Sequence, residues 1–108
     1  MVLFCVINAW RYHCRMPIQS FKCPDTQALF GRRRVTRWVN IESAARRKLE
    51  QLHMAGQPGD LLVPPGNRLE KLVNDREGRW SIRINDQWRV CFVWTEQGPG
   101  KVEIIDYH

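Results

Sequence analysis

Five apolar residues in the N-terminal half recur three or four positions apart, namely Trp38, Ile41, Ala45, Leu49 and Leu52. This spacing places them on one side of an amphipathic helix that ends at the glycines and proline of residues 56–59. A shorter helix is predicted to begin at Pro24 and to stop near Gly31. Pro17–Phe21 alternates weakly and suits a short edge strand.

The C-terminal half instead alternates between apolar and polar residues, which is typical of strands with one buried face. The apolar positions are Trp80, Ile82 and Ile84 in one run and Trp88, Val90, Phe92 and Trp94 in the next. Residues 97–100 then predict a turn, and the apolar residues at 102, 104 and 105 indicate a final strand. The pattern predicts an α+β fold, with two N-terminal helices packed on one face of a small antiparallel β-sheet.

The turn between the first two of these strands decides their register. A two-residue turn, Asn85–Asp86, would place Ile84 opposite Gln87. A three-residue turn, Asn85–Gln87, places Ile84 opposite Trp88 and keeps one face wholly apolar, so we prefer it. The same register sets Arg83 directly opposite Arg89 on the other face.

The length of 108 residues indicates one domain. Residues 1–15 match no expected element, and Met16 opens a segment that looks like a natural start, so we expect an upstream or non-native extension (1–15) followed by a single domain (16–108). The net charge is +6, and residues 1–50 hold 10 basic side chains against 3 acidic ones. This imbalance suggests a polyanionic partner, with nucleic acid first and a merely solvated basic surface as the alternative.

The four cysteines, Cys5, Cys14, Cys23 and Cys91, form no C-x-x-C pair, and no cluster has metal-ligand spacing. We therefore expect reduced thiols in a reducing, cytoplasmic compartment, and neither a metal site nor a cofactor.

The chain closes with a carboxylate, a phenol and an imidazole in a row: Asp106, Tyr107 and His108. If the last strand lies beside residues 87–95, these groups would approach Arg89. An arginine and proton-transferring groups are the minimum set needed to cleave RNA without a metal by attack of its own 2′-hydroxyl, because that reaction needs a base, an acid and charge stabilisation. Glu70 offers a second carboxylate. Taken alone, each of these groups is more simply explained as a solvated residue on the surface of the sheet.

Three segments resemble HigB toxins of the RelE/ParE superfamily: Asn67–Glu70, Asp75–Phe92 and Val102–His108. The resemblance covers residues 16–108. It implies a ribosome-dependent, metal-independent endonuclease that cleaves messenger RNA in the 70S ribosomal A site. It also implies a HigA-type helix-turn-helix antitoxin, operator binding only through the antitoxin complex, and no membrane association.

By motif position, the resemblance assigns catalytic roles to five residues: Glu70, Arg89, Asp106, Tyr107 and His108. We expect RNA-backbone contacts from four more: Arg68, Lys71, Arg76 and Arg83. Two other functions stay open. One is a non-nucleolytic ParE-like toxin that acts on DNA gyrase, and the other is an inactive module that binds antitoxin and represses an operon.

One departure from the family pattern yields a prediction. Most relatives have a lysine where this chain has Val73, which removes an expected phosphate contact, and Lys71 would replace it only imperfectly. Val73→Lys should therefore strengthen growth arrest on expression and make RNA binding more salt-dependent. A variant with no gain in growth arrest would contradict this interpretation.

Overall fold

The computed structural model describes residues 17–73 and 75–107, so the expected extension at 1–15 lies outside the described residues. Four strands form one antiparallel sheet in the order β1-β2-β3-β4. The elements in chain order are α2 (Pro24–Phe30), η1 (Thr36–Ile41), α3 (Glu42–Met54), η2 (Pro58–Leu62), η3 (Pro65–Asn67), β1 (Glu70–Lys71), β2 (Trp80–Arg83), β3 (Trp88–Thr95) and β4 (Gly98–Asp106). The predicted α+β class is confirmed.

The predicted apolar stripe is buried, but its first turn is not α-helical. The stripe begins in the 3₁₀ segment η1, where Trp38 has φ −114° and ψ 17°, and continues in α3. Thr36, Val39 and Ile41 are β-branched, which disfavours α-helix at this point. Leu49 and the other core positions of α3 nevertheless face inward as the spacing predicts.

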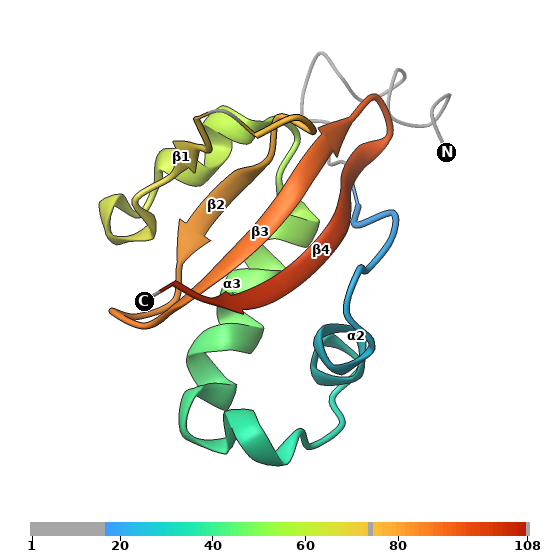
Figure 1. The fold of residues 1–108 in the computed structure, drawn as a ribbon, viewed down its shortest axis with the longest axis vertical. Helices are drawn as coiled ribbons and strands as arrows, with labels where there is room; N and C mark the ends of the chain where they lie inside the picture. The colour runs from blue at the N-terminus through green and yellow to red at the C-terminus, as the bar shows by residue number, and fades with distance from the viewer. Residues whose placement is uncertain (1–16, 74, 108) are drawn as a thin grey trace.

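The helices meet the sheet in two ways. α3 passes behind the sheet, and α2 lies beyond its β4 edge (Figure 1). At that edge the buried Thr26 accepts a hydrogen bond at Oγ1 from the backbone N–H of Ile104, at 3.0 Å. Both helices contribute to one hydrophobic core with the apolar face of the sheet. The finer prediction, that both helices lie on one face, stays a prediction.

The hairpin register is confirmed. Ile82 pairs with Val90 and Arg83 with Arg89. The side chain of Asn85 stabilises the turn, because its Oδ1 accepts hydrogen bonds from the backbone N–H groups of Gln87 (2.9 Å) and Trp88 (2.8 Å). One face of the sheet is therefore apolar, and the other face, here called the polar face, carries Arg83 and Arg89.

Two predicted boundaries differ from the structure. Pro17–Phe21 is an extended segment beside β4 with a single parallel bridge, Phe21 to Val102, rather than a full strand. The last turn falls at residues 96–97, and β4 already begins at Gly98. Thr95 stabilises this tighter turn, since its hydroxyl donates to the Gly98 carbonyl at 2.6 Å and Gly98 has the positive φ (132°) that glycine tolerates.

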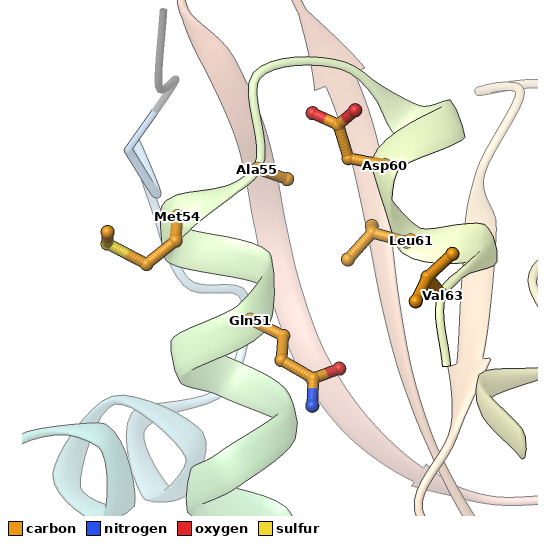
Figure 2. Close-up of a pocket in the computed structure, with 6 residues that line it drawn as sticks. All are labelled: Gln51, Met54, Ala55, Asp60, Leu61 and Val63. Carbon is orange, nitrogen blue, oxygen red and sulfur yellow. The ribbon is translucent and has the colours of Figure 1, made fainter. Parts of the chain in front are cut away.

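A shallow hollow of about 400 Å³ opens where α3 ends and η2 begins (Figure 2). Its lining residues are Gln51, Met54, Ala55, Asp60, Leu61 and Val63. None of them belongs to the polar face. Across the described part of the chain, no helix is long and apolar enough to cross a lipid bilayer.

The shared core generates a stability prediction. Leu49 is 0% exposed, so Leu49→Ala should lower the free energy of unfolding by about 3 kcal/mol in urea denaturation. The control is Leu62→Ala, whose side chain is 61% exposed and whose loss should change the free energy by less than about 0.5 kcal/mol. Equal effects of the two variants would contradict the described core.

Candidate active site

Arg89 is the buried cation of the polar face, with only 7% of its surface exposed. Its Nε donates to Ser81 Oγ at 2.8 Å. Its Nη2 donates to the carbonyl oxygens of Arg68 (2.5 Å) and Ser81 (3.3 Å). These acceptors satisfy a group that would otherwise be costly to bury.

Tyr107 and Glu70 complete a cluster around this guanidinium. The Arg89 Cζ lies 5.1 Å from the centroid of the Tyr107 ring, within the range of a cation–π contact. The Tyr107 hydroxyl donates to Glu70 Oε1 at 2.7 Å, and the same oxygen lies 4.0 Å from Arg89 Nη2. Residues from β1, β3 and the end of β4 therefore meet on one face.

The sheet pairing explains this convergence. Glu70 pairs with Ser81 on the neighbouring strand, which sets its carboxylate on the polar face. The backbone N–H of Tyr107 donates to the Gln87 carbonyl at 2.6 Å and so extends the β3–β4 ladder past Asp106. Because Arg89 pairs with Ile105, alternation returns Tyr107 to the side of Arg89.

The surroundings of Tyr107 favour its protonated form. Its hydrogen bond to the Glu70 carboxylate raises the pKa of the phenol, and partial burial and the negative charge of Glu70 act in the same direction. The phenol is therefore protonated at neutral pH.

Asp106 does not join this cluster. Asp106 pairs with Trp88, which places it on the opposite face from Arg89, and it accepts a hydrogen bond from Gln87 Nε2 at 3.1 Å. His108 lies outside the described residues. Of the two described residues at this end of the chain, Tyr107 lies against Arg89 and Asp106 does not.

The four residues expected to contact RNA are dispersed. Arg83 faces Arg89 across the hairpin, but its Nη2 binds Asp86 Oδ1 at 2.5 Å, so an internal carboxylate relieves the expected repulsion. Arg68 is exposed next to the cluster. Lys71 pairs with Trp80, and its ammonium lies 5.5 Å from that ring, on the opposite face. Arg76 is exposed in the turn before β2.

Sequence reasoning did not identify the fully buried Ser81 as part of the site. Its position among apolar strand residues, facing the same side as Arg83 and Arg89, was the available signal. Cys91 is also buried on this face, and burial raises the pKa of its thiol to about 11, so it is a poor nucleophile. Cys23 and Cys91 are both free thiols, as predicted, whereas Cys5 and Cys14 lie outside the described residues.

Comparisons with known proteins identify the family. Residues 31–108 match a family model described as the RelE-like toxin of the type II toxin–antitoxin system HigB. Toxin HigB-1 of Vibrio cholerae serotype O1 is 47% identical over 57 residues, which cover 53% of this chain and 60% of that protein. Endoribonuclease HigB of Proteus vulgaris is 32% identical over 97 residues, which cover 84% of this chain and 99% of that protein. The chain therefore belongs to the HigB-like family of RelE-like toxins.

Proposed function

We propose that this chain is the toxin of a type II toxin–antitoxin system and acts in the cytoplasm as a ribosome-dependent, metal-independent messenger RNA endonuclease. The observation that carries the proposal is the meeting of the Arg89 guanidinium, the Tyr107 phenol and the Glu70 carboxylate on one face. A relative that aligns over 84% of the chain bears the name Endoribonuclease HigB, which supports the same activity.

In the proposed reaction, the 2′-hydroxyl of the RNA attacks the adjacent phosphorus and the 5′-oxygen leaves. Arg89 stabilises the negative charge on the phosphoryl oxygens. His108 takes the proton of the 2′-hydroxyl. Tyr107 gives its proton to the departing 5′-oxygen. Before the reaction Glu70 holds the Tyr107 hydroxyl through their 2.7 Å hydrogen bond, and the phenol then turns this proton from Glu70 to the 5′-oxygen.

The proposed partners follow from the same assignment. The toxin enters the A site of the 70S ribosome, where Arg68, Arg76 and Arg83 contact RNA phosphates. Lys71 lies on the opposite face, so its contact is farther from the cleaved bond. A HigA-type helix-turn-helix antitoxin neutralises the toxin, and operator DNA is bound only through that complex.

Primer extension on ribosome-bound messages tests the activity. The wild-type chain should produce discrete cuts in the A-site codon, and Arg89→Lys should reduce the cleavage rate by about 100-fold, because lysine lacks the planar set of donors. Arg47→Lys, on the exposed surface of α3, is the matched control and should cleave normally.

Two other outcomes would contradict the proposal. Replication arrest without cuts would favour a toxin acting on gyrase. Absence of both effects would favour an antitoxin-binding co-repressor.

Tyr107→Phe tests the proton donor without disturbing the core, because Tyr107 is 44% exposed. The ring stays over Arg89 while the hydroxyl is lost, so cleavage at saturating ribosome complex should fall by about 100-fold and binding should change little. Cleavage at the wild-type rate would show that the phenol is not the acid. Glu70→Gln is a useful companion, since it weakens the acceptor but leaves the phenol intact.

A further inference from the structure

The guanidinium of Arg89 is fixed along one edge by the protein itself. Nε and Nη2 form this edge, and both donate to acceptors of the fold: the Ser81 hydroxyl, the Ser81 carbonyl and the Arg68 carbonyl. The remaining terminal nitrogen, Nη1, makes no hydrogen bond to any residue that the structure describes. Among the described residues, one edge of the guanidinium is therefore occupied, whereas Nη1 has no acceptor.

The Arg68 carbonyl, one of these acceptors, belongs to a segment that is hydrogen-bonded to α3. Arg68 adopts a left-handed conformation, with φ 46°, directly after Asn67. Asn67 is 0% exposed; its Nδ2 donates to Gln51 Oε1 and to the Leu61 carbonyl, both at 3.1 Å. Its Oδ1 accepts from Lys48 Nζ at 2.6 Å. The Arg68 carbonyl that meets Arg89 thus belongs to a segment anchored to α3.

The Ser81 hydroxyl is the side-chain acceptor of Arg89. Ser81 is 0% exposed and sits one strand away from Arg89, with its hydroxyl 2.8 Å from Nε. A buried hydroxyl costs free energy unless it is hydrogen-bonded. Here it contacts the one group of the polar face that is both buried and positively charged.

We propose that Ser81 is a positioning residue for Arg89: with the Arg68 carbonyl, it occupies the Nε–Nη2 edge, so that Arg89 meets the cleaved phosphate through Nη1 in one fixed orientation. This inference rests on the proposed nuclease function and extends it to a residue that does not touch the RNA. A fixed donor needs no reorganisation when negative charge develops on the phosphoryl oxygens. It therefore contributes most to stabilising the transition state.

Ser81→Ala tests the proposal in the full chain with two readouts. The first is single-turnover cleavage of ribosome-bound message, where the rate at saturation should fall by about 10- to 100-fold through misplacement of the guanidinium. The half-saturating ribosome concentration should stay unchanged. The second is the NMR signal of the Arg89 Nε–H, assigned by its loss in Arg89→Lys. Its exchange with water should be slow in the wild type and faster in Ser81→Ala.

Two variants serve as controls. Ser43→Ala removes a hydroxyl from the exposed surface of α3 and should change neither readout. Ser81→Thr keeps a hydroxyl at the same position and should restore slow exchange and cleavage. Thermal unfolding of each variant separates these effects from loss of the fold.

The outcomes decide between the inference and the function on which it rests. Ser81→Ala with wild-type exchange would show that the serine does not hold Arg89. Faster exchange with an unchanged cleavage rate would show that holding Arg89 does not position it for catalysis. If the wild type itself makes no cuts, the proposed function fails, while the exchange measurement still reports whether Ser81 holds the guanidinium.

Discussion

The arrangement of the polar face depends on the burial of one cation. A guanidinium removed from water must find acceptors for its N–H groups, and a buried charge without them is strongly destabilising. The fold supplies a serine hydroxyl and two backbone carbonyls to Arg89, and the carboxylate of Glu70 lies 4.0 Å from its Nη2. Satisfying the charge within the protein also fixes the direction in which the rest of the guanidinium points.

The apolar face of the sheet contributes to the stability of the fold, and the polar face carries the candidate active site. Ile82, Val90 and Ile104 face the helices and form the core with α3. Their strand neighbours face away and carry the cluster around Arg89. Because alternation along each strand links the two faces, a register that buries the apolar set also determines which polar groups meet. Substitutions on the polar face can therefore alter the site without creating a cavity in the hydrophobic core.

Local patterns predicted much of this structure. The helical spacing up to Leu52 and the alternation of the hairpin gave the correct elements, and the requirement for one apolar face gave the correct hairpin register. The 3₁₀ turn at Trp38 was not predicted, because the spacing of apolar residues is similar in both kinds of helix. The last turn was placed too late, since Gly98 looks like a turn residue but is paired in β4.

The site was predicted less completely for a physical reason. Arg89, Tyr107 and Glu70 were expected in the site and do meet. Asp106 was also expected there, but its position depends on the β3–β4 register, and the turn that sets this register lies at residues 96–97 rather than at the predicted residues 97–100. Ser81 and the Arg68 carbonyl were missed, since the residue type says nothing about the contacts of a backbone oxygen and a lone serine on a strand is a weak signal. Tertiary contacts of this kind become visible only when the strands are paired.

The central claim, that a fixed Arg89 meets the cleaved phosphate, is tested most directly by a structure of the chain bound to a ribosome whose A-site codon carries 2′-O-methyl groups. The methyl groups block attack and trap the complex before cleavage. The account predicts a non-bridging phosphate oxygen within about 3 Å of Arg89 Nη1, with Nε still bound to Ser81. A message that runs along the opposite face, with its phosphates far from Arg89, would contradict it.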